Sequence, residues 1–360
     1  MNIGIPKERR PYEFRVGMSP AGVEMLSRNG HTIFLEHDAG AGAGFKDHDY
    51  EEAGARIAYS AEEAYGRADL LLKFARPMDE ELEWIRPGSA LAGFLLLAST
   101  RQSKIDAFLQ KKVTTIAYEQ IQLPDGSLPV MRPLSQICGN MTALIAGRLL
   151  QCNYGGKGIL LGGVPGVPPA EVGIIGAGTV GRCAARAFIG LGAHVTLIDK
   201  DVKALQHILE QCPHVVTMIA TQRNVEKVCS YADVLIGSVH VPGERAPMMV
   251  NRQMVRSMKP RSIIIDIAID QGGCFETSRP TAHDQPTYIE EDVVHYCVPN
   301  IPSLVARTAT HAFVNSAINY IIEMANLGVE RAMQKDPSIA AAINTHDGKL
   351  HHLYRLTGTR

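Results

Sequence analysis

The chain has 360 residues, of which 46% are hydrophobic and 20% are charged. This is the composition of a folded globular protein, and the chain is longer than one compact core usually is, so we expect two domains. A formal net charge of -1 and a pI near 6.9 argue against a nucleic-acid-binding protein. We expect the partners to be a small molecule and further copies of the chain.

The sequence also argues against a membrane or secreted protein. The longest apolar runs, at 89–99 and 263–269, are shorter than the roughly 20 residues that cross a bilayer. Residues 1–7 lack the apolar core of a signal peptide, so we expect a cytoplasmic protein. The seven cysteines form no CxxC pair and are expected to be reduced thiols. We expect no metal site, because no paired Cys/His constellation is present.

The first third of the sequence alternates apolar runs with polar helical stretches. Residues 2–5 predict a strand, and Ser19 and Pro20 then supply the N-cap and first-turn proline of a helix that Gly30 ends. The segment 61–67 predicts another helix. This alternation predicts an α/β domain with a mostly parallel, buried sheet. Its other strands are expected at 31–36, 70–74, 90–97 and 113–118.

A second pattern of strands and helices begins after a connector. Residues 153–169 are rich in glycine and proline, which suits a bend rather than the interior of an element. The alternation that follows predicts a doubly wound parallel sheet. Its strands are expected at 171–175, 194–198, 214–219, 233–237 and 262–269, with helices from 179 and 202.

The apolar spacing after Ala306 predicts a helix of about 20 residues, which we expect to return to the first domain. Each domain would then have a mostly parallel sheet flanked by helices. The predicted domains are a discontinuous first domain, residues 1–130 and 307–360, and a second domain, residues 131–306.

A glycine-rich turn follows the first strand of the second sheet. Gly176, Gly178 and Gly181 form a GxGxxG motif that opens a helix, where the backbone turns tightly and approaches a pyrophosphate. Asp199 ends the next predicted strand, at the position where a carboxylate accepts hydrogen bonds from the adenosine ribose. The motif and the aspartate together predict dinucleotide binding.

The charge of the aspartate also bears on which dinucleotide is bound. A carboxylate at Asp199 would repel the 2′-phosphate of NADP, so the sequence favours NAD. Lys200 and Lys203 would offset part of this repulsion. Residues 131–306 are therefore predicted to be a Rossmann-type NAD-binding domain, and residues 1–130 and 307–360 the discontinuous substrate domain.

Three charged residues are candidates for the chemistry, and each has a structural alternative. Asp270 is expected on the same face of a strand as Asp266 and is followed closely by a glycine pair, which makes it a candidate acid or base. The alternative is an aspartate that only stabilises a turn. Lys73 ends a buried run, so it would either hold a carboxylate or serve as a tuned amine, unless it is an ordinary surface lysine. Arg15 would clamp a carboxylate or simply be solvated.

Several longer segments resemble the alanine dehydrogenase family, which is related to the alpha subunits of NAD(P) transhydrogenases. The resemblance runs from Asn2 to about Lys349. It implies reversible NAD-dependent oxidative deamination of an L-amino acid, L-alanine to pyruvate and ammonium, by a homohexamer. The segments are NIGIPKE at 2–8, FRVGMSPAGVEML at 14–26, LPDGSLP at 123–129, GILLGGVPGVPPAEVGIIGAGTVG at 158–181, DIAIDQGGCFETSRPTAHDQPTY at 266–288 and VPNIP at 298–302.

The resemblance also implies roles for individual residues. Arg15 and Lys73 would bind the substrate carboxylate, and Asp270 and Lys73 would take part in catalysis. Asn300 would lie near the nicotinamide. The cofactor contacts that the resemblance implies are Ser135, Gly176, Gly178, Thr179, Val180, Gly181, Asp199, Lys203, Val239, His240, Ile267, Ala268, Ile269, Asp270, Arg279, Val298, Pro299, Asn300 and Ile301.

The chain departs from the family pattern at one position that matters for catalysis. The family has a catalytic histidine where this chain has Leu96. Leucine exchanges no proton, and loss of a positioned acid or base typically costs about 10² to 10⁴ in rate. Smaller departures are Ala220, His240, Ile301 and Ala306.

Leu96 leaves three hypotheses open. The first is an NAD-dependent amino acid dehydrogenase with a more apolar substrate pocket. The second is an NAD(H)-binding paralogue without dehydrogenase activity, serving as a redox sensor or a structural oligomer. The third is a transhydrogenase-like protein, which the segment 266–288 disfavours because it follows the dehydrogenase pattern.

Overall fold

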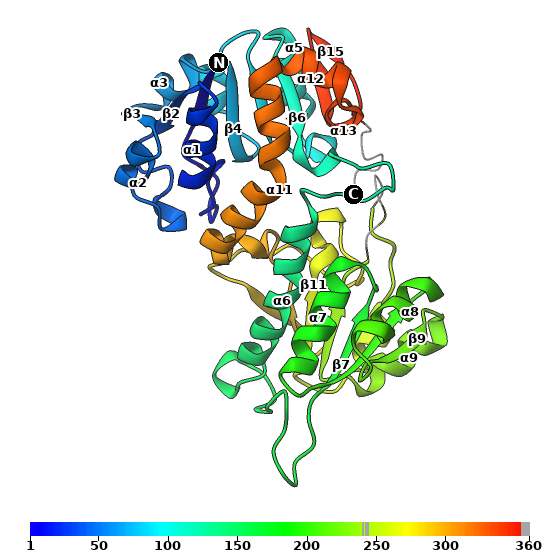
Figure 1. Cartoon of the computed structure of the whole chain (residues 1–360). Coiled ribbons are helices and arrows are strands. Elements are labelled where there is room, and N and C mark those ends of the chain that lie inside the picture. The colour runs from blue at the N-terminus through cyan, green and yellow to red at the C-terminus, as the bar shows by residue number, and fades with distance from the viewer. Residues whose placement is uncertain (240, 242–244, 354–360) are drawn as a thin grey trace. The chain divides into compact units, whose positions relative to one another are not determined.

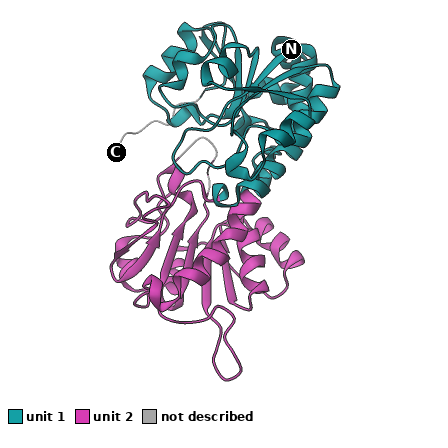
Figure 2. Ribbon diagram, turned by 90° about the vertical axis from the view of Figure 1, so that its left-hand side faces the viewer, with its two compact units in different colours: residues 1–134, 302–360 teal, residues 135–301 magenta. Residues whose placement is uncertain are grey.

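The structure is a computed structural model that describes residues 1–239, 241 and 245–353. It divides into two compact units (Figure 2). Unit 1 comprises residues 1–134 and the described residues from 302 onward, and unit 2 comprises residues 135–301. Each unit has its own mostly parallel sheet flanked by helices, which confirms the predicted fold class.

Unit 1 is built on an eight-stranded sheet of order β15-β14-β6-β5-β4-β1-β2-β3. Strands β1 to β6 are parallel to one another, whereas β14 pairs antiparallel with both β6 and β15. The segments that follow β1, β4, β5 and β6 therefore meet at one edge of the sheet. The strands are β1 (Asn2–Ile5), β2 (Thr32–Glu36), β3 (Ala55–Ala58), β4 (Leu70–Ala75), β5 (Ala90–Phe94), β6 (Thr114–Ala117), β14 (Ile343–His346) and β15 (Lys349–Leu350).

Helix α1 of unit 1 begins at the predicted cap. The Ser19 hydroxyl accepts a hydrogen bond from the Gly22 N–H at the start of α1, as expected for an N-cap. Ser60 caps α3 in the same way. The helices are α1 (Pro20–Arg28), α2 (Asp47–Glu52), α3 (Ala61–Gly66), α4 (Glu81–Trp84), α5 (Gln102–Gln110), α11 (Ala306–Leu327), α12 (Val329–Lys335) and α13 (Pro337–Ala341), with 3₁₀ turns η1 (Ala41–Ala43), η2 (Leu97–Ser99) and η3 (Tyr118–Gln120).

Helix α11 packs within unit 1, which confirms the predicted long helix after Ala306 and its return to this part of the chain (Figure 1). Its Phe313 ring lies 5.1 Å from the Phe74 ring of β4 and 5.7 Å from the Phe94 ring of β5. Tyr118, just after β6, lies 5.1 Å from Phe313. These aromatic side chains fix the carboxyl ends of three strands against one helix.

The end of β5 differs from the prediction. A strand was expected over 90–97, but β5 ends at Phe94, and Leu96 adopts a left-handed conformation with φ +45°. The 3₁₀ turn η2 follows. The apolar run continues past the strand because Leu95 and Leu97 are buried in a core beneath α3 and α5, not because the strand does.

Unit 2 is built on a seven-stranded sheet of order β12-β13-β11-β10-β7-β8-β9. All strands are parallel except β12, which forms an antiparallel hairpin with β13. The chain runs outward from β7 to β9 and then returns to β10 on the other side, so the strand order reverses between β7 and β10. The strands are β7 (Glu171–Ile175), β8 (His194–Asp199), β9 (Val216–Ile219), β10 (Val234–Gly237), β11 (Ile263–Asp266), β12 (Thr287–Glu290) and β13 (Val293–Tyr296).

Helices cover both faces of this sheet. Side chains of α6, α7 and α8 share one apolar core, and those of α9 and α10 share the other. This is the two-faced burial that a doubly wound parallel sheet requires. The helices are α6 (Arg132–Leu149), α7 (Thr179–Gly190), α8 (Val202–Gln211), α9 (Gln222–Tyr231) and α10 (Arg252–Arg256), with 3₁₀ turns η4 (Cys152–Tyr154), η5 (Ile267–Gln271) and η6 (Ile301–Val305).

The strand expected over 262–269 is shorter than predicted. β11 ends at Asp266, whose carboxylate accepts the backbone N–H of Ala268 at 3.0 Å and so caps the turn η5. Asp270 therefore lies in a 3₁₀ turn, and the predicted strand parity with Asp266 is wrong. Helix α9 and the β12–β13 hairpin were not predicted.

Two further predictions concern the whole chain. Among the described residues, no helix is both long and apolar enough to cross a bilayer. All seven cysteines are free thiols, as expected.

Candidate functional site

The three glycines of the GxGxxG motif hold distinct positions after β7. Gly176 has φ +107°, a conformation that favours glycine, and a Cβ there would lie 2.7 Å from the Ser238 carbonyl. A Cβ on Gly181 would lie 1.8 Å from the Gly176 carbonyl, so only glycine lets α7 pack this close to the strand. A Cβ on Gly178 would meet nothing within 4 Å. Space is thus left beside the first turn of α7, where a pyrophosphate approaches backbone N–H groups.

Asp199 lies at the end of β8, beside this turn. Its carboxylate accepts the Ala177 N–H at 2.5 Å and the Asp201 N–H at 2.8 Å. These bonds fix the carboxylate next to the glycine turn, and the N-terminus of α7 begins at Thr179. The described residues therefore fit a dinucleotide, with its phosphates at α7 and a ribose at Asp199.

Other predicted cofactor residues follow the carboxyl ends of neighbouring strands. Val239 follows β10, residues 267–270 follow β11, and residues 298–301 follow β13. The Ser238 hydroxyl donates to the Ile175 and Gly176 carbonyls at 3.0 Å, which joins the ends of β10 and β7. In open α/β sheets, ligands bind at such a carboxyl edge, where the strand order reverses.

The exposure of these residues varies. Lys203 is exposed in the first turn of α8, and Ala268, Ile269, Val298 and Ile301 are buried. Asn300 has a left-handed conformation with φ +62°. Pro299 is half-buried, as are Val180 and Thr179 at the start of α7. His240 lies outside the described residues.

Asp270 is exposed in η5, whereas Asp266 is buried and committed to backbone N–H groups. Burial, with a smaller contribution from the Asp270 carboxylate, raises the pKa of Cys138 to about 12. Asp270 therefore lies near Cys138 on α6, one turn beyond Ser135. Arg279 is exposed, with its guanidinium 4.0 Å above the Tyr288 ring.

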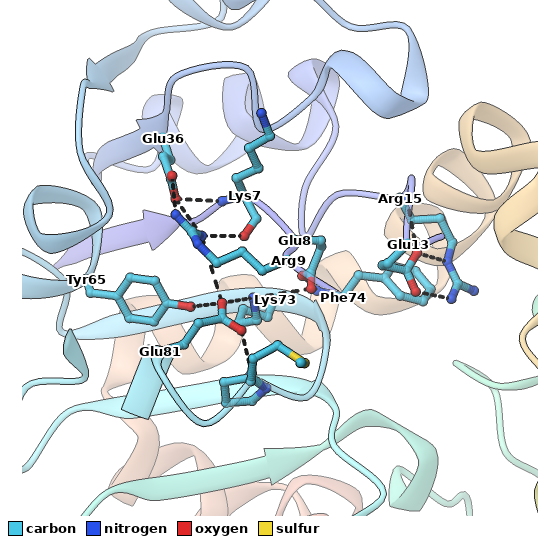
Figure 3. A network of polar contacts seen from close by, with 12 residues as sticks. Lys7, Glu8, Arg9, Glu13, Arg15, Glu36, Tyr65, Lys73, Phe74 and Glu81 are labelled. Atoms are coloured by element: carbon cyan, nitrogen blue, oxygen red, sulfur yellow. Dashed lines mark hydrogen bonds and ion pairs between the residues drawn. The ribbon is translucent and has the colours of Figure 1, made fainter. Parts of the chain in front are cut away.

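Arg15 lies in unit 1 with its guanidinium already engaged (Figure 3). Its Nε and Nη2 donate to the two carboxylate oxygens of Glu13 at 2.7 and 2.6 Å, and Arg15 is only 5% exposed. The guanidinium also lies 3.7 Å from the centre of the Phe74 ring. Arg15 would bind a substrate carboxylate beside or in place of Glu13.

Lys73 is fully buried in the middle of β4, between two carboxylates (Figure 3). Its Nζ lies 2.7 Å from Glu81 and 3.2 Å from Glu8. Glu81 also accepts the Tyr65 hydroxyl at 2.5 Å, and Glu8 accepts the Phe74 N–H at 2.6 Å. Every member of this cluster contacts another, so the network is an internal structure of unit 1.

The pKa shifts agree with this description. Burial lowers the pKa of Lys73, but Glu8 and Glu81 raise it more, so the ammonium stays charged. Burial raises the pKa of Glu81, but Lys73 and Tyr65 reverse this, and the net shift is downward. Burial raises the pKa of Glu8 to about 7 despite Lys73. The geometry thus disfavours the expected role of Lys73 as a substrate ligand and favours a buried ion pair.

Leu96 occupies a turn directly after β5 in unit 1. The residue is 46% exposed, and the Leu96 N–H donates to the Glu119 carboxylate at 2.7 Å. The Leu95 N–H donates to the same carboxylate at 3.2 Å. Burial raises the pKa of Glu119 to about 7. No proton transfer is available from the Leu96 side chain itself.

Comparison with known proteins identifies the family. The N-terminal domain of the family described as alanine dehydrogenase/PNT matches residues 4–138, and its C-terminal domain matches residues 142–353. The chain belongs to the alanine dehydrogenase/PNT family. An alanine dehydrogenase of Mycolicibacterium smegmatis is 43% identical over 97% of this chain and 94% of its own length. One of Methanococcus maripaludis is also 43% identical, over the same shares.

Solved structures of the alanine dehydrogenase/PNT family share the fold. An L-alanine dehydrogenase superposes with a TM-score of 0.94 and 42% identity, covering 98% of this chain and 97% of that one. A transhydrogenase from Sinorhizobium meliloti gives a TM-score of 0.82 and 25% identity, covering 98% and 99%. The resemblance inferred from the sequence segments is confirmed.

Glu13, Glu81 and Glu119 were not predicted, although each holds a candidate residue of this family member. The sequence carries a signal for Glu119, because it directly follows a predicted strand at the ligand edge of a parallel sheet. Glu13 and Glu81 bond to residues 2 and 8 positions away, and no motif marks those pairs.

Proposed function

We propose that the chain binds NAD(H) in unit 2 and catalyses reversible oxidative deamination of an L-amino acid, alanine or a close variant, to the 2-oxo acid and ammonium. The observation that carries the proposal is the glycine turn with Asp199 at the point of strand reversal. It occurs in a chain that is 43% identical to alanine dehydrogenases over nearly its full length.

The glycine turn and Asp199 would hold the cofactor, which when bound accepts the hydride from the substrate Cα. Loss of this hydride from the neutral amine leaves an iminium, and water adds to its carbon before ammonium departs. The Asp270 carboxylate is exposed, so it would take a proton from the attacking water and return it to the leaving nitrogen. Arg15 would hold the substrate carboxylate.

The preference for NAD follows from Asp199. Its carboxylate, fixed by two backbone N–H groups, would accept both ribose hydroxyls and repel a 2′-phosphate. Lys200 and Lys203 are the candidates to offset this charge, and both are exposed.

The remaining site residues are proposed as cofactor contacts on their position alone. Val239, residues 267–270 and residues 298–301 all follow strands that end at the same edge. We further expect a cytoplasmic homo-oligomer, a hexamer by family resemblance.

The test measures NADH formation with a panel of L-amino acids, together with NADH affinity by calorimetry. Asp270→Asn should lower kcat by about 10² to 10⁴ and leave NADH affinity within a few-fold. The matched control is Asp292→Asn, because Asp292 is exposed at the opposite edge of the same sheet, before β13. Equal turnover in both variants would reject Asp270 as the acid or base.

One observation favours a second candidate, an NAD(H)-binding protein without dehydrogenase activity. Leu96 exchanges no proton, and Lys73 is sequestered by Glu8 and Glu81. This candidate predicts NADH binding with no turnover on any amino or 2-oxo acid. Hydride transfer between two dinucleotides would instead support a transhydrogenase-like activity.

A further inference from the structure

The turn at Leu96 combines a strained backbone with an exposed apolar residue. Its backbone lies at φ +45° and ψ +43°, a left-handed conformation that leucine rarely adopts. Leu96 is nevertheless 46% exposed, so its burial in unit 1 offsets little of the strain. Strained conformations of this kind persist where surrounding contacts over-determine them, and they cluster at functional sites.

Hydrogen bonds on both sides of the Leu96 peptide hold the turn. The Glu119 carboxylate accepts the N–H groups of Leu95 and Leu96 at 3.2 and 2.7 Å. The Ser99 hydroxyl donates to the Leu96 carbonyl at 3.0 Å, and an Arg76 N–H does so at 3.5 Å. Two parallel strands and their following segments thus supply partners to one exposed leucine.

The turn stands where unit 1 would receive a ligand. Leu96 follows β5, Arg76 follows β4 and Glu119 follows β6, so all three lie at the carboxyl edge of adjacent parallel strands. Arg15, the candidate carboxylate ligand, stacks on Phe74 of β4, and Phe74 contacts Phe94 of β5 at 5.1 Å.

We propose that Leu96 is the side-chain recognition residue of the substrate site, that Glu119 is the positioning residue that fixes it, and that the substrate is an amino acid with an apolar side chain longer than that of alanine. This inference rests on the proposed function, because it concerns the same site. An exposed leucine offers apolar surface that a methyl group covers poorly and a propyl group covers well.

The experiment measures the Kd of pyruvate and of 2-oxopentanoate for the NADH-loaded protein, and kcat/KM for L-alanine and L-norvaline. We expect the longer ligand to be preferred by at least about tenfold, since a methylene in an apolar pocket is worth about 10–200-fold. Leu96→Gly removes the apolar surface, so the preference should fall to within about threefold, while Tm rises because glycine relieves the left-handed strain.

Two variants separate positioning from stability. Glu119→Gln keeps one acceptor but sets an amide N–H against a backbone N–H, so it should lower the preference for 2-oxopentanoate with little change in Kd for pyruvate. Lys112→Gly is the matched control, because Lys112 is also left-handed, with φ +51°, but precedes β6 at the opposite edge. It should leave the preference unchanged.

The ratio of the two Kd values decides the inference without requiring turnover. A preference for pyruvate, an unchanged ratio in Leu96→Gly, or no binding of either 2-oxo acid would overturn it. Selective binding without NADH formation would sustain the inference and reject the dehydrogenase activity.

Discussion

Replacement of Lys73 by methionine separates its two possible roles. Lys73 was predicted to bind the substrate carboxylate, but its ammonium lies 2.7 Å from Glu81 and 3.2 Å from Glu8, and no part of it is exposed. Methionine matches the lysine side chain up to Cε and removes the ammonium group, with both its charge and its N–H donors. If Lys73 is a buried ion-pair partner, Lys73→Met should mainly lower the free energy of unfolding.

The expected loss is about 3–5 kcal/mol, the usual cost of leaving a buried charge without its partner. Glu81 keeps the Tyr65 hydroxyl and the Met78 N–H as donors, and Glu8 keeps the Phe74 N–H. These bonds do not replace a positive charge, and the Arg9 guanidinium, 3.9 Å from Glu81, replaces it only in part. A destabilisation of this size corresponds to a fall in Tm of roughly 6–20 °C for a domain of this size.

The assay is urea unfolding, with Lys112→Met as the exposed-lysine control, expected within about 0.5 kcal/mol of the unchanged protein. The double variant Lys73→Met, Glu81→Gln should recover part of the loss, because only Glu8 then remains to be protonated. Unchanged stability of Lys73→Met together with loss of 2-oxo acid binding would refute this reasoning and restore the predicted substrate role.

Three further predictions concern the cofactor turn, the ribose site and Glu119. Gly178→Ala should change the free energy of unfolding by less than about 1 kcal/mol, because the added Cβ has no atom within 4 Å, yet it should weaken NADH binding measured by calorimetry. Gly181→Ala should lower Tm, because its Cβ would lie 1.8 Å from the Gly176 carbonyl. Asp199→Ser should lower the Kd for NADPH relative to the Kd for NADH. An unchanged ratio of the two values would show that Asp199 does not recognise the ribose. Burial raises the pKa of Glu119 from 4.5 to about 7, so the folded state favours the neutral form of this side chain. Its contribution to the free energy of unfolding is therefore full below pH 4.5 and is lost as pH rises through 7. The unfolding free energy of the unchanged protein, minus that of Glu119→Gln, should therefore fall over this range, and a flat difference would contradict the shift.

The elements of unit 2 were predictable because local chemistry determines them. The glycines of the turn after β7 are required by backbone conformation and close approach, which leave a direct trace in the sequence. The end of β11 was misplaced, since Asp266 stops the strand through hydrogen bonds to Ala268 and Cys274 that apolar periodicity does not reveal. Helix α9 was missed although its capping residue, Thr221, follows β9 closely.

The candidate site of unit 1 was less predictable because partners distant in sequence determine the state of each charge. From the sequence, Lys73 is expected to be a lysine at the end of a strand. The fold shows that Glu8, 65 residues earlier in the chain, lies beside it. Leu96 reads as a strand residue, and only its bonds to Glu119 show that it occupies a turn. Apolar pattern identifies which residues are buried, but not which carboxylate meets which cation.

The two units therefore bear differently on catalysis. In unit 2, the requirements for a dinucleotide are met by backbone geometry and one fixed carboxylate, so substitutions elsewhere leave them intact. In unit 1, the leucine turn is held by a carboxylate and a hydroxyl, and such a clamp is retained only if the residue it presents has a use. A chain that had lost all substrate chemistry would have no reason to keep leucine in a left-handed turn, where glycine would be less strained. The strain at Leu96 thus favours a substrate-binding enzyme with altered side-chain selectivity over a protein that binds only the cofactor.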